Sequence, residues 1–401
     1  MKSALISSYC LESTMPLSKY LVEEGVGVDL FLIMPKKTQN LYVVDFSKDK
    51  QPMGFVDQMM AKTVLGKRLC EYLGNINTYF FVLHGGGRKN LISDIFYCWK
   101  LSKHISNQHY DVVHLIHTYG RISFFLLYFL RKQNLIQTLH EVSAHDGITS
   151  KIDTKIFKRL VSKNIPIIFH SDIAKNRFLS YRNELNYSDP LQNNLYTVIR
   201  FGLFETYKCF DVENQVYDYS KKTDSNIPII LHFGRILPYK GIDVLIDAVK
   251  IVQKQKPVHL IIAGNGNPYF SFEGIESYEF INRTITNEEI IQLIKKSDMV
   301  VCPYKSASQS GIPLTVFLYN KPIIASNVGA FKEVIDTNVN GILIDTISGF
   351  EFSEAILKLV NDPILTNKMS EKIFEKFNIE EEYSWSKIAK NTMNFYKNSI
   401  Q

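Results

Sequence analysis

The sequence predicts an α/β protein built from two doubly wound domains, on three observations. The chain has 401 residues, too many for one ordinary hydrophobic core and suited to two domains of about 200 residues each. In both halves, short apolar runs alternate with amphipathic helical patterns, as in parallel sheets whose strands are joined by crossover helices. Between the halves, residues 205–226 lose this periodicity and become polar, which predicts a linker.

The composition is that of a soluble globular protein, with 45% hydrophobic and 21% charged residues. The longest apolar run, 122–130, is far shorter than the roughly 20 residues needed to cross a bilayer. Residues 1–10 lack the apolar core of a signal peptide, so we expect a cytoplasmic protein whose five cysteines remain thiols at packing positions. The net charge of +6 suits an anionic substrate or an anionic membrane surface, and the lack of a dense basic block argues against nucleic acid.

In the N-terminal half, seven short apolar runs predict the strands of one sheet. They lie at 4–7, 28–33, 79–83, 112–115, 135–139, 165–169 and 196–199. Helical patterns fall between them, at about 14–24, 91–107, 121–132, 151–163 and 172–182. Because open α/β sheets bind ligands beyond the carboxyl ends of their strands, residues that directly follow these runs are candidates for a site.

Two histidines follow neighbouring predicted strands. His117 and His140 each come just after the end of a strand, and His145 and Asp146 lie on the loop that His140 opens. An imidazole at such a position can bond a ligand hydroxyl or move a proton near neutral pH. The alternative for each histidine is a structural residue whose hydrogen bonds are satisfied within the fold.

The C-terminal half opens on the pattern that organises the second domain. A buried strand at 229–233 ends at Gly234, and Arg235 and Lys240 lie in the loop that leads to an apolar helical pattern. A strand, a glycine turn, two cations and a helix N-terminus together form a place for a doubly charged anion, and we expect a diphosphate. The alternative is that both cations are only the solvated edge of a loop.

Three more turns in this half follow predicted strands. Glycines let a ligand approach backbone amides in the first, and small residues before an apolar helix free amides for phosphate oxygens in the second. The first turn is Gly264, Asn265 and Gly266, and the second is Ser308, Gln309, Ser310 and Gly311, with Ile312 opening the helix. The third turn, around Ile285, leads into a capping box of Thr286 and Glu289.

This set of motifs resembles the retaining GT-B glycosyltransferases of family four, glycosyltransferase group 1, whose second domain opens with Gly-Arg, a few residues and then Lys-Gly. The resemblance covers most of the C-terminal half and, more faintly, the N-terminal half. It implies a GT-B fold, with two Rossmann-like domains at 1–204 and 227–384 that face each other across a cleft. The helix at 385–401 would then cross back to complete the first domain.

The resemblance also implies roles for the residues quoted above. Arg235 and Lys240 would hold the diphosphate of a nucleotide sugar, with Gly234 shaping their turn. His140 would be the catalytic residue that orients the donor sugar. The acceptor-side candidates are His117, His145 and Asp146. The other donor-binding candidates are Gly264, Asn265, Gly266, Ile285, Ser308, Gln309, Ser310, Gly311, Ile312 and Thr315.

The sequence departs from the family pattern at two places. Most members carry two glutamates eight positions apart, and these places fall at Ala307 and Thr315, neither of which supplies a carboxylate. Ser-Gln-Ser-Gly at 308–311 resembles a known variant of the family, so phosphate binding would be preserved while ribose binding is rebuilt or weakened. The family's glycine-rich loop after the first strand is absent from 7–14, which leaves the contribution of this loop to the site open. A lone glycine triplet, at 85–87, is a weak signal, and we interpret it as a flexible turn rather than as a replacement for that loop.

The resemblance implies a hexosyltransferase that moves a sugar from a nucleotide diphosphate sugar to a glycan or lipid-linked saccharide with retention of configuration, in cell-surface polysaccharide synthesis. No metal and no cofactor is expected, because protein cations and backbone amides would stabilise the leaving diphosphate. A sugar-nucleotide epimerase or hydrolase on the same fold is one alternative. A non-catalytic scaffold subunit is another, and the two missing glutamates are its best support.

The pattern at 151–163 predicts a basic amphipathic helix. Lys151, Lys155, Lys158 and Arg159 share one arc, and an apolar set lies opposite. Such a helix can lie against anionic lipid on the inner face of the cell membrane, at roughly 1 kcal/mol per cation near the surface. The alternative is a surface helix whose basic face is solvated and whose apolar face packs on the sheet.

Overall fold

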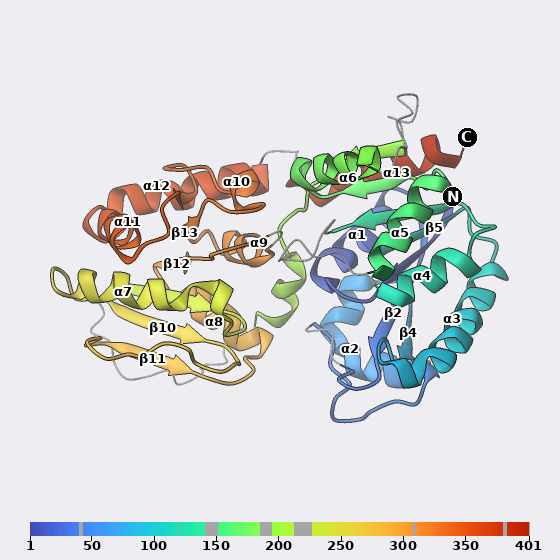
Figure 1. The fold of residues 1–401 in the computed structure, drawn as a ribbon, viewed down its shortest axis with the longest axis horizontal. Coiled ribbons are helices and arrows are strands. Elements are labelled where there is room, and N and C mark those ends of the chain that lie inside the picture. Colours follow the sequence, from blue (N-terminus) through green and yellow to red (C-terminus); the bar gives the residue numbers. More distant parts are fainter. Residues whose placement is uncertain are drawn as a thin grey trace. The chain divides into compact units, whose positions relative to one another are not determined.

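The described part of the computed structural model covers residues 1–39, 43–118, 120–140, 151–184, 195–211, 227–307, 310–379 and 383–400. The chain divides into two compact units (Figure 1). Unit 1 contains Met1–Gly202 and Glu382–Gln401, and unit 2 contains Leu203–Glu381. Each unit is an α/β structure built on its own sheet, as the sequence predicts.

The sheet of unit 1 is parallel apart from one edge strand. Its described strands run in the order β3-β4-β2-β1-β5-β6-β7-β8, and β3 pairs with β4 in the antiparallel sense. They are β1 (Lys2–Ser7), β2 (Gly27–Pro35), β3 (Gly54–Phe55), β4 (Asn77–Leu83), β5 (Val112–His117), β6 (Leu135–Leu139), β7 (Ile167–Phe169) and β8 (Tyr196–Val198). Each of the seven predicted apolar runs overlaps one of these strands.

The helices of unit 1 follow the predicted pattern with one exception. They are α1 (Leu11–Glu23), α2 (Gln58–Leu73), α3 (Leu91–Ser106), α4 (Gly120–Phe129), α5 (Lys151–Ser162), α6 (Asp172–Glu184) and α13 (Trp385–Ile400), with a short η1 (Arg88–Asn90) before α3. The sequence pattern does not predict α2. This helix is interrupted at Gly66, whose φ of 71° lies outside the helical region, so its apolar periodicity is broken between two short halves. No helix in the described ranges is long and apolar enough to span a membrane.

The apolar side of α5 is buried inside unit 1. Ile156, Phe157 and Leu160 are all at most 5% exposed, and the guanidinium of Arg159 donates to the carbonyl of Leu127 on α4. The three lysines of the basic arc are exposed, Arg159 is half-buried against α4, and the apolar side packs on the fold. This matches the surface-helix alternative and leaves α5 no apolar face for lipid.

The last helix returns to unit 1. α13 packs against α1, and the hydroxyl of Tyr396 lies 2.7 Å from Nδ1 of His114 on β5. Nε2 of His114 lies 2.7 Å from Oγ1 of Thr138 on β6, so one buried imidazole ties the helix to two neighbouring strands. The chain end therefore completes unit 1, as the resemblance to GT-B proteins implies.

Unit 2 has an entirely parallel sheet in the order β11-β10-β9-β12-β13-β14. Its strands are β9 (Ile229–Phe233), β10 (His259–Ala263), β11 (Tyr278–Ile281), β12 (Met299–Cys302), β13 (Ile323–Ser326) and β14 (Gly341–Ile344). Its helices are α7 (Ile242–Gln253), α8 (Asn287–Lys296), α9 (Ile312–Phe317), α10 (Phe331–Val334), α11 (Gly349–Asn361) and α12 (Pro363–Phe374), with η4 (Pro238–Lys240) before α7 and η5 (Glu375–Ile379) after α12. Helices α7 and α11 pack together over an aliphatic core.

Part of the predicted linker is folded into unit 2. A 3₁₀ helix, η3 (Glu205–Phe210), contacts α8, and Asp211 accepts from Nζ of Lys295 at 2.5 Å. The linker prediction for 205–211 therefore overlooked a polar segment that is held by packing and an ion pair. The rest of the predicted linker, 212–226, lies outside the described residues.

Candidate functional site

The turn after β9 is built so that only glycine fits. Gly234 has a φ of 120°, and a Cβ on Gly264 would overlap the carbonyl oxygen of Gly234. The amide of Gly234 donates to Ala263, and the amide of Ile236 donates to Asn265. The two glycine turns that the sequence singles out therefore pack backbone to backbone at the carboxyl ends of β9 and β10.

Lys240 lies at the end of the first of these turns, against an aromatic ring. Its Nζ is 2.5 Å from the hydroxyl of Tyr304 and 3.8 Å from the centroid of that ring. Burial lowers the pKa of Lys240 to about 8, and the neighbouring charge of Arg235 adds to this effect. A Cβ on Gly241 would overlap the carbonyl of Pro303, so the loop is pressed against the end of β12. A partly buried ammonium with a lowered pKa lacks a compensating negative charge, and a bound diphosphate would supply it.

The turn before α9 is also shaped by close packing. A Cβ on Gly311 would overlap the ring of Phe204, so glycine is the residue that fits. Oγ of Ser310 lies 3.4 Å from the amide of Ile312 at the start of the helix. The hydroxyl of Thr315 donates to the carbonyl of Gly311, and this side chain is 4% exposed. Thr315 is thus a core residue of α9, and its hydroxyl hydrogen is already used in the bond to Gly311.

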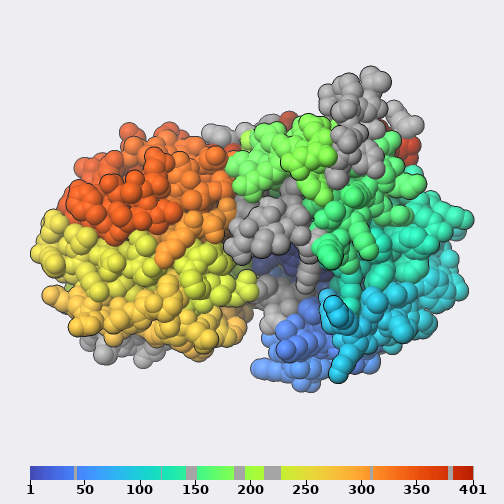
Figure 2. All heavy atoms as spheres, viewed as in Figure 1, coloured from blue at the N-terminus to red at the C-terminus, as the bar shows by residue number. Residues whose placement is uncertain are grey.

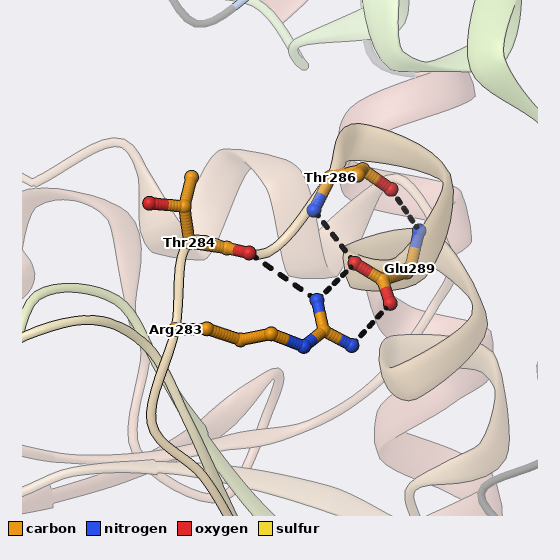
Figure 3. A network of polar contacts seen from close by, with 4 residues as sticks. All are labelled: Arg283, Thr284, Thr286 and Glu289. Atoms are coloured by element: carbon orange, nitrogen blue, oxygen red, sulfur yellow. Dashed lines mark hydrogen bonds and ion pairs between the residues drawn. The ribbon is translucent and has the colours of Figure 1, made fainter.

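An ion-pair network holds the turn at the end of β11 (Figure 3). Nη1 and Nη2 of Arg283 donate to the carboxylate of Glu289 at 2.8 and 2.6 Å, and Nη1 also donates to the carbonyl of Thr284. The same carboxylate accepts from the amide of Thr286, whose hydroxyl accepts from the amide of Glu289, so the predicted capping box is present. Ile285 lies within this network, which holds the backbone on both sides of it in one conformation.

Three histidines meet at the carboxyl ends of three neighbouring strands in unit 1. His117 ends β5, His140 follows β6 and His170 follows β7. Their ring centroids are 5.5, 5.6 and 6.1 Å apart. Tyr9, from the loop after β1, lies 5.2 Å from His117, and Phe201 stacks on His170 at 3.7 Å. We refer to His117, His140 and His170 as the histidine cluster.

Hydrogen bonds set the tautomers of two members of the histidine cluster. Oγ of Ser13 donates to the carbonyl of Cys10, so it accepts from Nε2 of His117, 3.1 Å away. Nδ1 of His170 lies 2.8 Å from the carbonyl oxygen of Ile199 and must donate to it. In the neutral rings, Nδ1 of His117 and Nε2 of His170 are then acceptors. Both atoms are buried, and neither has a hydrogen-bond partner within the described ranges.

Burial keeps these rings neutral at physiological pH. It lowers the pKa of His117 well below its usual value and that of His170 to about 3, and the neighbouring His140 adds to both shifts. A cavity of about 20 Å³ adjoins His117 and His170, which is room for one water. The histidine cluster therefore carries two acceptor lone pairs, which can accept from a water in this cavity or from a ligand hydroxyl that replaces it. It could also hold a cation, because one nitrogen of each ring lies within 4.8 Å of the others.

The structure brings together some of the histidine-side candidates in unit 1 and some of the donor-binding candidates in unit 2. His117 and His140 meet, and Gly234, Lys240 and Gly264 share one edge of the sheet in unit 2. Four predicted site residues lie outside the described residues: His145, Asp146, Ser308 and Gln309.

Sequence reasoning missed three residues of the histidine site. His170 directly follows the predicted strand 165–169, so the rule that selected His117 and His140 applies to it as well. Tyr9 and Ser13 lie on the loop after β1 and in the first turn of α1, and no local pattern marks them as partners of the histidines. Their role depends on the pairing of β1 with β5, which the local sequence does not reveal.

Comparison with known proteins identifies the family of the second unit. Residues 227–362 match the family model described as Glycosyl transferases group 1. Unit 2 carries a group 1 glycosyltransferase domain. The resemblance drawn from the Gly-Arg and Lys-Gly motifs is thereby confirmed.

Curated relatives agree with this group 1 assignment over part of the chain. An uncharacterised glycosyltransferase of Methanocaldococcus jannaschii is 26% identical over 183 residues, which are 43% of this chain and 45% of that protein. The poly(ribitol-phosphate) alpha-N-acetylglucosaminyltransferase of Staphylococcus aureus is 25% identical over 203 residues, which are 47% of this chain and 40% of that protein. The match thus spans less than half the length of these relatives.

A solved structure shows the fold of the whole chain. The Anabaena protein HepE, crystallised in complex with UDP, superposes with a TM-score of 0.62 at 13% identity, covering 99% of this chain and all of that one. At this identity the likeness establishes the fold alone, and the chain has the GT-B fold. The predicted fold class is confirmed.

Proposed function

We propose that this protein transfers a hexosyl group from a nucleotide diphosphate sugar to a glycan or lipid-linked saccharide, with retention of configuration and without a metal. The observation that supports this most is the partly buried ammonium of Lys240, which lies beside two glycine turns in a group 1 glycosyltransferase domain. Its pKa is lowered to about 8 because burial deprives it of solvent, and no carboxylate is among the groups that shift it. A diphosphate meets that need, and UDP is the ligand of the Anabaena structure with the same fold.

Stabilisation of the leaving diphosphate follows from the same geometry. As the bond between the sugar and the phosphate oxygen breaks, negative charge develops on the diphosphate, and Lys240 and the exposed Arg235 neutralise it. The amides of Ser310 and Gly311 add hydrogen bonds to phosphate oxygens. Because the hydroxyl hydrogen of Thr315 is committed to Gly311, the ribose receives less from this protein than the phosphates do.

The histidine cluster supplies the hydroxyl-binding part of the proposed reaction. Nδ1 of His117 and Nε2 of His170 are acceptors, so each would take a hydrogen bond from a sugar hydroxyl. His140 would orient the donor sugar. Because the rings of His117 and His170 stay neutral near pH 7, they would hold saccharide by hydrogen bonds rather than by charge.

The acceptor class and the location are part of the same proposal. The Staphylococcus relative is named as an enzyme that acts on poly(ribitol-phosphate), which supports a polymeric or lipid-linked acceptor in cell-surface polysaccharide synthesis. A lipid-linked acceptor is held at a membrane, so we place the proposed enzyme in the cytoplasm, at the inner face of the cell membrane.

A non-catalytic scaffold subunit is the second candidate function. It rests on Ala307 and on the buried Thr315, because neither offers a carboxylate where most group 1 proteins have one. A scaffold would be expected to retain the fold and lose turnover. Donor binding and donor turnover must therefore be measured separately.

The deciding experiment is a thermal-shift screen of the full chain against nucleotide diphosphate sugars, followed by product analysis. A donor present at 100 times its Kd should stabilise the protein by about 2.7 kcal/mol, and Lys240→Ala should abolish most of the shift. His140→Ala should keep the shift and lose turnover. A shift without release of nucleoside diphosphate would indicate a scaffold. If no donor gave either a thermal shift or release of nucleoside diphosphate, the proposed transfer would be excluded.

A further inference from the structure

Helix α3 presents large apolar side chains to solvent on one side. Ile92, Phe96 and Trp99 follow one another at helical spacing, and they are 83%, 52% and 44% exposed. Leu91, in the first turn, is 43% exposed. The opposite side of the helix is buried against the sheet and carries Asp94, Cys98, Leu101, Ser102 and Ile105. The helix is thus anchored by one side, and the other side contributes little to the folding of unit 1.

The exposed side of α3 is also strongly basic. Lys103 continues the apolar row by one more turn, and its Nζ lies 5.3 Å from the ring centroid of Trp99. The other exposed cations of this segment are Arg88, Lys89 and Lys100. The segment 88–107 contains one acid, Asp94, which is fully buried and pairs with Arg121 on α4. We call these four cations and Leu91, Ile92, Phe96 and Trp99 the α3 face.

We propose that the α3 face docks on an anionic lipid bilayer. An exposed row of Ile, Phe and Trp flanked by lysines is the composition of a helix that lies in the membrane interface, with apolar side chains among the acyl chains and ammonium groups at the headgroups. The charge on the α3 face has one sign, which complements anionic lipid. Lysine is depleted at interfaces between proteins, so the same surface suits lipid better than a protein partner.

The position of α3 in the fold is compatible with this docking. Helix α3, drawn in cyan in Figure 1, lies at the surface of unit 1, and cyan atoms of this part of the chain form part of the surface drawn in Figure 2. Helix α5, the basic helix that the sequence suggests for this purpose, has its apolar side buried. The structure therefore transfers the membrane assignment from α5 to α3. Docking needs only the surface of unit 1, so it is independent of the proposed transfer reaction.

The chain carries its own reporter for this contact. It has two tryptophans, Trp99 on the α3 face and Trp385, which is 5% exposed inside unit 1. Transfer of Trp99 from water to lipid should shift its emission to the blue, while Trp385 adds a constant background. Brominated acyl chains should quench Trp99 selectively. The Trp99→Phe variant should still bind vesicles but lose the spectral change.

Vesicle binding of the full chain tests the proposal with matched variants. Vesicles of phosphatidylcholine with phosphatidylglycerol should sediment the protein, and pure phosphatidylcholine should do so far less. Reversal of Lys100 and Lys103 to Glu should lower the partition constant by roughly 25-fold or more, as expected for two surface cations. The same reversal at Lys155 and Lys158 on α5 changes the net charge equally, and it should have a much smaller effect.

A second pair of variants tests the apolar part of the α3 face. Phe96→Ser with Trp99→Ser should lower vesicle binding at least about tenfold, leave donor binding unchanged and lower the melting temperature only slightly, because both side chains are about half exposed and lie outside the core. Three outcomes would overturn the proposal: no binding to anionic vesicles, equal loss from the α3 and α5 reversals, or self-association that these serines abolish in the absence of lipid.

Discussion

Ser13 and His117 are 104 residues apart in the chain, and Oγ of Ser13 lies 3.1 Å from Nε2 of His117. Because this serine donates its hydrogen to Cys10, the imidazole must be the donor to it, and its acceptor lone pair is left at Nδ1. Cys10 has a φ of 53° and immediately precedes α1, which places the first turn of that helix against the end of β5. One backbone turn therefore decides which nitrogen His117 offers to a ligand.

Removing this hydrogen bond should affect turnover more than donor binding. Ser13→Ala frees His117 to adopt the other tautomer, so kcat/KM for the acceptor should fall by about fivefold, the equivalent of about 1 kcal/mol for one hydrogen bond. Ser18→Ala is the matched control, because Ser18 is also buried on α1 but donates to Thr14. Equal kinetics in both variants, or a change in donor Kd with Ser13→Ala, would contradict a positioning role for Ser13.

Donor binding should weaken in alkaline solution because of Lys240. Its pKa is lowered to about 8, and a diphosphate binds the protonated ammonium, so affinity should be level below about pH 8 and fall by about tenfold per pH unit above it. Calorimetric titration with a nucleoside diphosphate between about pH 6.5 and 9.5 would show this profile. Lys240→Ala should bind more weakly by about 1.5 to 3 kcal/mol and lose the decline, whereas Lys240→Arg should keep its charge throughout. If the affinity of Lys240→Ala still fell above about pH 8, another titrating group would be responsible for the decline.

Unit 1 should lose stability in mild acid. His114 and His117 are buried as neutral rings and their pKa values lie below the usual 6.5, so the unfolded chain takes up protons first as the pH falls. Stability is full above about pH 6.5 and should drop at pH 5.5 by about 1.4 kcal/mol for each histidine. Urea unfolding followed by tryptophan emission reports unit 1, since Trp99 and Trp385 both belong to it. Stability that stays level between about pH 7 and 5.5 would contradict this prediction.

Removal of divalent ions should leave the rate of transfer unchanged, and added zinc should lower it. The proposed charge neutralisation uses Lys240 and Arg235, so EDTA should leave the rate unchanged. Zinc favours imidazole ligands, and it would occupy the lone pairs that sugar hydroxyls need in the histidine cluster. Micromolar zinc should therefore inhibit, and His170→Asn should be less sensitive in relative terms. Loss of activity in EDTA that zinc or magnesium restores would show that a metal takes part.

The fold could be predicted wherever the local pattern carried the information. Parallel strands are buried on both faces, so they appear as apolar runs between helical patterns, and this alternation is enough for both sheets. The pattern fails at α2, where Gly66 interrupts the periodicity. It also cannot tell which apolar residues are covered: Phe96 and Trp99 look like core residues in the sequence, and α5 looks like the helix with a spare apolar face.

The candidate site likewise has features that the sequence predicts and features that depend on the order of the strands. Gly234 and Lys240 follow the same strand, so sequence spacing places them near each other, whereas Gly264 meets Gly234 because β10 pairs with β9. The contact between Lys240 and Tyr304 depends on β9 lying beside β12. Burial at this place lowers the pKa of the lysine. His170 joins His117 because β5, β6 and β7 are adjacent, which is a property of strand order that no local motif contains.

The ribose of the donor should matter less than its phosphates. The hydroxyl of Thr315 is buried and donates to Gly311, so a donor that lacks its 2′-hydroxyl should lose about 1 kcal/mol or less, against 1.5 to 3 kcal/mol for a bond to a charged group. Ser310→Pro removes one amide from the proposed phosphate cradle and should cost far more, whereas Ser310→Ala keeps that amide and serves as its control. Circular dichroism must first show that the proline variant is folded. The affinities of the parent protein and of the proline variant for ribo and 2′-deoxy donors would then be compared. If loss of the 2′-hydroxyl weakened binding strongly while Ser310→Pro left it unchanged, the nucleotide would have to bind elsewhere on unit 2.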